Sequence, residues 1–210
     1  KLALAEDLST YENRLNTDRA KVYMKELEDT YMSFRCETYL EGDFDLQNLG
    51  QMQVDPNIRK EVQDNIKKSV VIEKLGPNSD IIYTEMNFPF PFENRDLVHH
   101  RVYISSKKDP ELIEKYGLWK KDNEYFIVAT KSVERSDTPP IKGITRAHTR
   151  FMSFIYEKDA ENSKRVKVTL VNIADMKMKP PSMLRGMAAK KMGKDYTTGL
   201  ETAYKKHFKN

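Results

Sequence analysis

Hydrophobic and polar side chains alternate over much of the chain, at the two-residue period of a half-buried β-strand. Two such stretches, over residues 20–27 and 30–40, are expected to form strands near the N-terminus. Six more strands are expected after residue 69, over residues 70–75, 80–86, 97–105, 124–133, 143–157 and 165–173. No long helical stretch separates these six, so the pattern predicts an antiparallel sheet rather than a doubly wound parallel one.

Other stretches repeat their apolar residues at helical spacing. An N-terminal helix is expected within residues 1–18. Asp43 is the candidate N-cap of a second helix. Asp55, followed by Pro56, opens a third helix that is expected to run to about residue 68, since proline is tolerated in a first helical turn. The first part of the chain is therefore predicted to combine two strands with three helices.

The strongest helical pattern covers residues 180–208 at the end of the chain. Apolar side chains recur there at four-residue steps, at Leu184, Ala188, Met192, Tyr196, Leu200, Tyr204 and Phe208. Gly186, Gly193 and Gly199 also fall in this helix, and each glycine lowers helix stability by up to about 1 kcal/mol relative to alanine. A helix weakened at three points is expected to open as a lid.

Charge is distributed unevenly along the chain, whose 210 residues (24.6 kDa), 1–210, are expected to form a single domain. The net charge is +4, but residues 176–210 alone carry nine Lys or Arg against two Asp or Glu. A cationic terminal helix favours an anionic partner surface. We expect transient contact with a membrane and not with nucleic acid, because no base-stacking motif accompanies the basic residues. The cations expected to dock are Arg185, Lys190, Lys191 and Lys194.

The sequence carries no motif for catalysis or metal binding. Cys36 is the only cysteine, which excludes an internal disulfide framework and a multi-cysteine zinc site. His99 and His100, adjacent on an expected strand, point to opposite faces and so do not serve one site. No apolar stretch approaches the roughly 20 residues that span a bilayer. We expect a soluble monomer without cofactor or enzymatic activity. Its compartment, cytoplasmic or secreted, is left open, since a targeting segment can precede Lys1.

The most specific motifs lie between residues 55 and 101. Residues 55–75 read DPNIRKEVQDNIKKSVVIEKL, and residues 81–101 read IIYTEMNFPFPFENRDLVHHR. Gly-Ile-Thr-Arg follows at 143–146, and two prolines precede the last helix at 180–181. In order and spacing, over about residues 20–208, these motifs resemble the START family of lipid-transfer domains (steroidogenic acute regulatory protein-related lipid transfer). The phosphatidylcholine carriers of that family are the most similar.

This resemblance implies an α+β helix-grip fold, in which a curved antiparallel sheet wraps around the C-terminal helix and encloses an internal lipid tunnel. It also implies a lipid transfer protein that binds one lipid, a phospholipid in preference to other lipids, and shuttles it between membranes. Three alternatives stay open. The resemblance is also compatible with a lipid-sensing module of a larger protein, with a sterol or ceramide carrier, and with an enzyme that has a polar catalytic cluster in the tunnel.

The resemblance also nominates polar residues for the tunnel. Glu85 and Arg101 match an acid and a base on adjacent strands inside it, and the alternative is an ion pair on the surface. Arg95 matches a position that contacts phosphate in the phosphatidylcholine carriers, and the alternative is a structural salt bridge with a neighbouring carboxylate. His148 and Arg150 would add polar contacts, or else lie on the solvated face.

Apolar contacts to the lipid are expected from the terminal helix. Met183 and Met187 are flexible and polarisable, which suits an adaptable tunnel wall, and Tyr196 lies on the apolar stripe. The phosphatidylcholine carriers surround the cationic choline with aromatic rings, but the matching strand here, residues 169–174, has no aromatic side chain. We therefore do not expect strict specificity for phosphatidylcholine.

Overall fold

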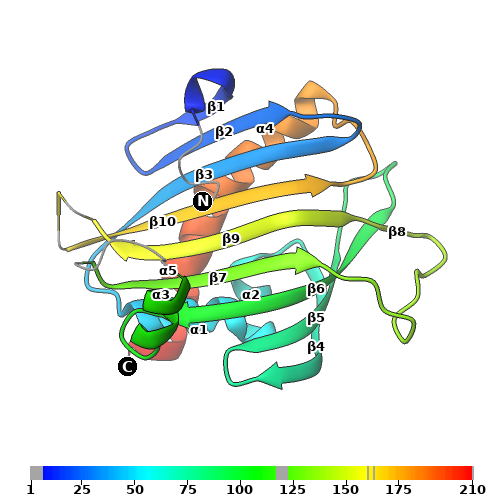
Figure 1. The fold of residues 1–210 in the computed structure, drawn as a ribbon. Helices are drawn as coiled ribbons and strands as arrows, with labels where there is room; N and C mark the ends of the chain where they lie inside the picture. Colours follow the sequence, from blue (N-terminus) through cyan, green and yellow to red (C-terminus); the bar gives the residue numbers. More distant parts are fainter. Residues whose placement is uncertain (1–6, 117–122, 160, 163, 210) are drawn as a thin grey trace.

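One curved β-sheet organises the protein, whose computed structural model describes residues 7–116, 123–159, 161–162 and 164–209. Ten strands lie in this part of the chain: β1 (Glu12–Asn16), β2 (Ala20–Glu26), β3 (Tyr31–Glu41), β4 (Ile66–Gly76), β5 (Ser79–Met86), β6 (Asn94–Ser105), β7 (Tyr125–Ser132), β8 (Ile144–Arg146), β9 (His148–Lys158) and β10 (Arg165–Asp175). Their order is β1-β2-β3-β10-β9-β7-β6-β5-β4, and β8 pairs with β6 (Figure 1). Each pair along this path is antiparallel, which confirms the predicted sheet.

Helices cover both faces of the sheet. They are α1 (Leu46–Val54), α2 (Pro56–Val62), α3 (Pro110–Tyr116), α4 (Ser182–Lys190) and α5 (Tyr196–Phe208). Figure 1 shows α1, α2, α4 and α5 behind the sheet, on the side that we call the concave face, and α3 in front of it. The strands followed by a C-terminal helical segment that grips their concave face form the helix-grip fold expected from the sequence.

The main core lies between the concave face and the helices. Leu49 and Met52 of α1, together with Leu200 of α5, pack with strand residues such as Phe126 of β7. Helix α1 lies so close to β7 that a Cβ atom on Gly50 would come within 2.2 Å of the Phe126 ring. In this structure, therefore, protein side chains occupy much of the space between the sheet and the helices.

The C-terminal helical segment is not one continuous α-helix. A π-helical turn over Lys191–Asp195 separates α4 from α5. Residues at four-residue steps drift by about 40° per step around an α-helix, because each residue advances about 100°. The π-helical turn has more residues per turn than an α-helix, so each of its residues advances by a smaller angle, which compensates for this drift. Tyr196, Leu200 and Tyr204 remain buried in α5, whereas Ala189 is the buried residue of α4.

The predicted N-terminal helix is wrong where the structure describes it; residues 1–6 lie outside the described part. Asp7 accepts a hydrogen bond from the amide of Ser9 and caps only a short 3-10 turn, Leu8–Thr10. Residues Glu12–Asn16 instead form the edge strand β1, whose backbone pairs with β2. Leu15 packs against the main core from this strand, so its apolar spacing served a strand and not a helix.

Two helix boundaries also differ from the prediction. Asp45, not Asp43, caps α1, since its side chain accepts a hydrogen bond from the Asn48 amide at 2.8 Å. Asp55 caps α2 as expected, but that helix ends at Val62 and not near residue 68. The backbone from Ile66 onward forms β4, where pairing with β5 outweighs the helical preference of the sequence.

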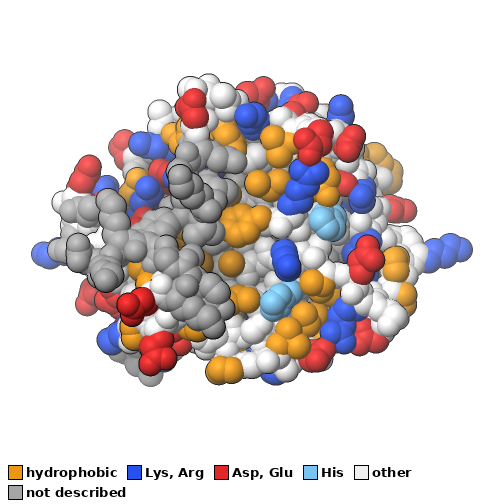
Figure 2. Space-filling view, viewed as in Figure 1, with side chains coloured by type: hydrophobic (Ala, Val, Ile, Leu, Met, Phe, Trp, Pro, Cys, Tyr) orange, Lys and Arg blue, Asp and Glu red, His pale blue; other side chains and the backbone are white. Residues whose placement is uncertain are grey.

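The outer face of the sheet is a mixed surface. Figure 2 views this face and shows Lys and Arg interspersed with Asp and Glu, with hydrophobic side chains between them. Beneath α3, a small second core joins Tyr125 and Ile127 of β7 to Ile155 of β9. Among the described residues, none of the helices is long and apolar enough to cross a membrane.

Candidate functional site

A buried ion pair lies on the concave face of β5 and β6. Asp80 and Arg101 are opposite each other in the strand register. The Arg101 guanidinium donates to both carboxylate oxygens, Nε to Oδ1 at 2.9 Å and Nη2 to Oδ2 at 2.8 Å. Its Nη1 donates to the backbone oxygen of Gln53 in α1 at 3.1 Å, which shows that the pair faces the helices. Neither side chain is more than 1% exposed.

A second buried guanidinium joins this pair from α2. Arg59 is 6% exposed, and its Nη1 donates to Thr84 Oγ1 of β5 at 3.3 Å. Burial, followed by the nearby charge of Arg101, lowers the pKa of Arg59 to about 10. From the edge strand, Lys74 Nζ approaches Asp80 Oδ2 at 3.2 Å. The Lys74 side chain is 58% exposed and solvated, so the two buried guanidiniums share one buried carboxylate, which leaves a surplus of positive charge.

Several polar groups beside these cations are buried without a partner. Among the described residues, none forms a hydrogen bond with either ring nitrogen of His99, either amide atom of Gln53, Nε of Arg59 or Oγ1 of Thr130. Burial, followed by the charges of Arg59 and Arg101, lowers the pKa of His99 to about 3, so its ring is neutral. An unpaired buried polar group costs about 1–3 kcal/mol, and such groups are rare. We call these groups, with Asp80, Arg101, Lys74 and Thr84, the polar cluster.

The rest of the concave face is mainly apolar, although Thr38 of β3 and Asn172 of β10 also lie on it. Val22 of β2, Leu40 of β3 and Leu170 of β10 belong to the main core. Between this region and the polar cluster, the hydroxyls of Tyr156 and Tyr196 lie 3.0 Å apart. Burial raises the pKa of both phenols, so both stay protonated. The concave face thus combines a cationic polar end with a larger apolar region, which suits an amphiphilic ligand.

The sequence prediction placed Arg101 correctly in the interior but paired it with the wrong acid. Glu85 is five residues from Asp80 on an unbroken strand, so its side chain points to the opposite face of β5. There it accepts from Lys67 Nζ at 2.8 Å and from Asn94 Nδ2 at 3.1 Å. Glu85 is therefore not part of the polar cluster.

Arg95 lies on the same face of β6 as Arg101, six residues and about 20 Å away along the strand. Its Nε donates to the Met176 backbone oxygen at 3.1 Å, and its Nη2 lies 3.0 Å from Met178 Sδ. Its Nη1 binds the Glu93 backbone oxygen, and the guanidinium lies 4.6 Å from the Phe88 ring centroid. These contacts occupy Arg95, so the geometry does not favour the predicted phosphate contact.

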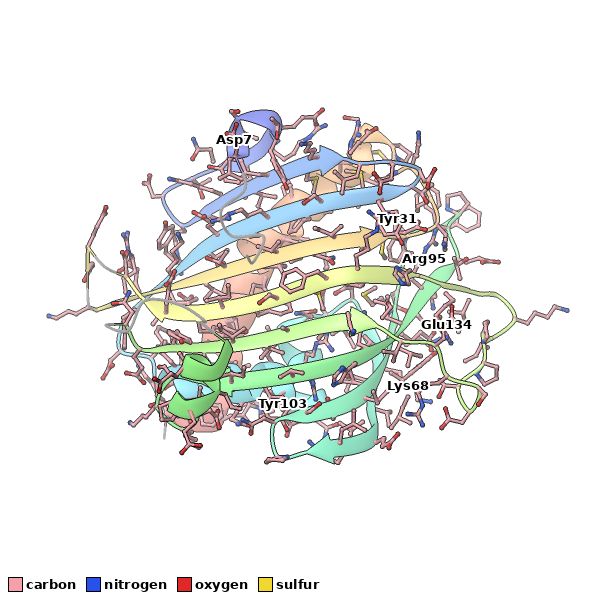
Figure 3. The ribbon with its side chains drawn as sticks, viewed as in Figure 1. Asp7, Tyr31, Lys68, Arg95, Tyr103 and Glu134 are labelled. Carbon is pink, nitrogen blue, oxygen red and sulfur yellow. The ribbon has the colours of Figure 1, made fainter. Side chains whose placement is uncertain are left out.

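His148 and Arg150 lie on the exposed end of β9, and the polar cluster contains neither of them. His148 Nδ1 is 2.9 Å from the hydroxyl of Tyr31, and the Arg150 guanidinium stacks 3.8 Å from the centroid of the same ring. Arg150 also pairs with Glu28 at 2.6 Å. Figure 3 shows Tyr31 and Arg95 at the same end of the sheet, while Tyr103 lies further along β6. The exposed positions of His148 and Arg150 match the alternative that both lie on the solvated face.

The expected tunnel-lining methionines of α4 point into solvent: Met183 is 72% exposed and Met187 is 52% exposed. The reason is the π-helical turn, which gives α4 a different inward face from α5. Tyr196, in contrast, is buried as expected.

Of the four cations predicted to dock on a membrane, Arg185 pairs with Glu26 and Lys191 with Asp64. The other two, Lys190 and Lys194, are exposed.

Two of the sequence motifs meet on the outer face. Asp96, from Asn-Arg-Asp, is fully buried and accepts two hydrogen bonds from Arg146, at 2.7 and 3.1 Å. Arg146 comes from the 143–146 motif, whose strand β8 runs parallel to the start of β6. These motif residues therefore hold the loop of residues 134–142 and β8 against β6, and they do not line the concave face.

Sequence reasoning missed Asp80, Gln53 and the partnership of Arg59 with Arg101. The only local signal is Arg59 itself, which together with Val62 occupies the inward face of α2. Asp80 and Gln53 carry no comparable signal, because each reaches the cluster through strand register or helix packing.

A pocket of about 430 Å³ also opens between α4 and the ends of β2 and β3, lined in part by Met24, Met32 and Arg185.

Comparisons with known proteins agree with this architecture. Human STARD10 is similar over 96% of this chain and 78% of its own, with 18% identity and a TM-score of 0.71. Human StAR-related lipid transfer protein 5 matches over 95% and 88% of the two chains, with 13% identity and a TM-score of 0.71. A STAR-related lipid transfer protein from Xanthomonas axonopodis matches over 96% and 99%, with 20% identity and a TM-score of 0.62. No curated protein matches the chain in sequence.

At these identities the solved structures establish the fold alone. The family follows from the sequence, because the model of the START domain matches residues 15–206. That match covers nearly the whole chain and agrees with the helix-grip architecture described above. The chain belongs to the START family.

Proposed function

We propose that this START domain binds one phospholipid on its concave face and carries it between membranes. In this proposal the phosphate lies at Arg59 and Arg101, and the acyl chains lie over the apolar part of the face. The observation that carries the proposal is the polar cluster, in which cations outnumber carboxylates and buried hydrogen-bonding groups are left unpaired.

A phosphate suits this cluster better than the hydroxyl of a sterol does. Buried cations are costly unless an anion neutralises them, and guanidinium groups bind phosphate through charge-assisted hydrogen bonds. A single hydroxyl would leave the surplus charge in place and would reach only one or two of the unpaired groups. The apolar surface supplies the rest of the affinity, since burial of acyl chains contributes about 0.8 kcal/mol per CH₂.

Loading requires the helices to move apart, because Leu49, Met52 and Leu200 occupy the space over the sheet in this structure. The pocket beneath α4 marks one place where a chain can enter. Met24 and Met32 form its apolar wall, and the Glu26–Arg185 ion pair borders it. Of the C-terminal segment, α4 buries the least, with Ala189 as its one buried residue among those described, so it is the part that moves at low cost.

The exposed face of α4 is suited to membrane contact. Met183, Met187 and Lys190 of α4, and Lys194 of the π-helical turn that follows, are all exposed. Their spacing of four, three and four residues places them on one side of the helical segment. Phe90, in the loop between β5 and β6, is 96% exposed, and Arg95 ties this loop to residues 176 and 178 just before α4. Apolar side chains beside cations favour an anionic bilayer surface.

The test is transfer of labelled phospholipids, cholesterol and ceramide between donor and acceptor vesicles by the wild-type chain and by Arg59→Leu. We expect phospholipid transfer that Arg59→Leu reduces at least about tenfold, since hydrogen bonds to a charged group contribute about 1.5–3 kcal/mol each. Arg150→Leu is the matched control, because Arg150 is exposed at the end of β9.

Other outcomes point to the other candidate functions. Transfer of cholesterol or ceramide alone would replace the phospholipid with a sterol or ceramide ligand. Binding of phospholipid without transfer would favour a lipid-sensing module of a larger protein. Equal loss of phospholipid transfer in Arg59→Leu and Arg150→Leu would remove the polar cluster from the proposal.

A further inference from the structure

The groups around the proposed phosphate position also constrain the rest of the head group. A quaternary ammonium such as choline needs a carboxylate or an open aromatic face. Asp80 already accepts two hydrogen bonds from Arg101 and one from Lys74. The ring of Tyr103 already has Arg101 at 6.0 Å and Lys74 at 5.8 Å from its centroid. The carboxylate of Asp80 and the ring of Tyr103 are therefore both engaged by cations of the protein.

Charge balance also disfavours a zwitterionic head group. Among the buried charges of the polar cluster, Arg59 and Arg101 are opposed by Asp80 alone, because the Lys74 side chain is 58% exposed and solvated, and the neutral ring of His99 adds no charge. A phosphate that carries a choline brings a positive charge along with its negative charge, so the surplus of the protein is left uncompensated. A head group with a net negative charge neutralises it, which matters because buried charge without a partner is costly.

The unpaired groups include acceptors as well as donors. Nε of Arg59 is a donor, and the neutral ring of His99 offers one donor and one acceptor. The Gln53 amide offers two donors and one acceptor, and the Thr130 hydroxyl offers both. Phosphate oxygens satisfy the donors but cannot satisfy Oε1 of Gln53 or the acceptor nitrogen of His99. These acceptors need hydrogen-bond donors from the ligand. An ammonium group would add positive charge to a cluster that already has a surplus of it, so O–H groups fit the acceptors better.

Building on the proposed phospholipid function, we infer that the ligand is an acidic phospholipid whose head group carries hydroxyls, of the phosphatidylglycerol or phosphatidylinositol type. Arg59 and Arg101 bind its phosphate, and Gln53, His99 and Thr130 bind its hydroxyls. Thr130 lies opposite Arg101 in the strand register, so both parts of the head group meet on adjacent strands.

The test is competition among lipids for the intact chain. The protein is incubated with vesicles that contain equal amounts of phosphatidylcholine, phosphatidylethanolamine, phosphatidic acid, phosphatidylglycerol, phosphatidylinositol and cholesterol. The protein is then re-isolated, and its bound lipid is measured by mass spectrometry. We expect phosphatidylglycerol or phosphatidylinositol to be enriched about tenfold or more over phosphatidylcholine, which corresponds to one or two additional buried hydrogen bonds.

Two variants assign the selectivity to this site. His99→Phe removes two hydrogen-bonding atoms and adds an aromatic face, so the enrichment is expected to fall toward parity while phospholipid is still bound. His100→Phe is the control: it is the same substitution at the next residue, which lies on the opposite face, where His100 contacts Ser79 Oγ at 2.8 Å. Gln53→Met provides a second test if His99→Phe does not fold, as judged by circular dichroism.

Each outcome tests either the inferred head group or the proposed phospholipid-carrier function on which it rests. Equal binding of phosphatidylcholine, or phosphatidic acid bound as well as the hydroxyl-bearing lipids, would overturn the inference and leave the phospholipid carrier intact. Enrichment that survives in both His99→Phe and Gln53→Met would overturn the assignment to this site. Binding of cholesterol alone, or of no lipid at all, would overturn the proposed function itself.

Discussion

Asp80 and Arg101 face each other across β5 and β6, and the Arg101 guanidinium binds both oxygens of the Asp80 carboxylate. The pair is out of contact with solvent, yet it lies next to a second guanidinium, that of Arg59, and to several unpaired polar groups. Because Arg101 engages both oxygens of the Asp80 carboxylate, this carboxylate does not neutralise the second cation. This shared carboxylate is the reason that the concave face keeps a surplus of positive charge.

Removal of the Asp80 charge is expected to destabilise the protein strongly. Asp80→Asn leaves Arg101 buried without its counter-ion, and the loss of one partner of a buried pair costs about 3–5 kcal/mol. Urea denaturation followed by circular dichroism measures the change. Glu28→Gln is the control, because Glu28 and its partner Arg150 are both exposed, and an exposed pair contributes about 0–1 kcal/mol. Equal destabilisation by the two variants would contradict this interpretation of Asp80.

Two glycines of the C-terminal segment are expected to respond oppositely to alanine. A Cβ on Gly199 would lie 2.4 Å from the Val62 backbone oxygen, so Gly199→Ala pushes α5 away from α2 and costs about 1–3 kcal/mol. At Gly186 nothing lies within 4 Å of the added Cβ, and alanine there favours the helix by up to about 1 kcal/mol. Thermal unfolding separates the two. A stabilising Gly199→Ala would show that this glycine softens the helix and does not serve close packing.

Membrane docking is expected to depend on the exposed cations of α4 and the π-helical turn. Exchange of Lys190 and Lys194 for Glu removes two lysines that each contribute about 1 kcal/mol near an anionic surface, so vesicle affinity should fall about 30-fold or more. Sedimentation with anionic vesicles measures this affinity. The same two charge reversals at Lys131 and Lys164, which are also exposed, are the control. Equal losses would indicate nonspecific attraction by net charge.

The neutral state of His99 predicts a dependence of stability on pH. The pKa of His99 is about 3 in the folded state, whereas an unfolded histidine titrates near 6.5. The unfolded chain therefore binds more protons below pH 6.5, and the folded state loses stability as pH falls through 6.5 toward 3. Between pH 7 and pH 5 this loss is about 2 kcal/mol.

The contribution of His99 is isolated by comparison with His99→Gln, because carboxylates with lowered pKa values, such as those of Glu37 and Asp175, also lose stability in acid. Urea denaturation at several pH values should show a steeper loss for the wild-type chain than for the variant. Parallel curves would mean that His99 is not held neutral in the folded state.

Local sequence patterns predicted most of the secondary structure. The alternation over residues 20–27 and 80–86 became β2 and β5, and Asp55 with Pro56 opened α2. These features depend on neighbours within a few residues, namely strand alternation, a capping carboxylate and the fixed φ of proline. The prediction of an N-terminal helix is wrong because it, too, rested on local spacing. This spacing suits a helix, but pairing with β2, which no local pattern reveals, makes residues 12–16 a strand.

The candidate site was less accessible from sequence. Arg101 and Arg59 are visible as cations in motif-bearing stretches, but the family resemblance pairs Arg101 with Glu85 and not with Asp80, the other acid on the same strand. The choice between Glu85 and Asp80 is a question of face, and the face depends on the register between β5 and β6. The prediction that Met183 and Met187 line a tunnel is wrong for a similar reason, since the π-helical turn changes which side of α4 meets the core.

The family, the antiparallel strands, the C-terminal helix and the concentration of positive charge near the end of the chain can all be read from the amino-acid sequence. They follow from residue types and short spacings, which act locally. The meeting of Asp80, Arg101, Arg59, His99 and Gln53 cannot be read in this way, because strand register and the packing of α1 and α2 bring together residues far apart in the chain. The tertiary structure also places their polar atoms beyond the reach of water, and burial is what gives an unpaired cation or amide its affinity for a ligand.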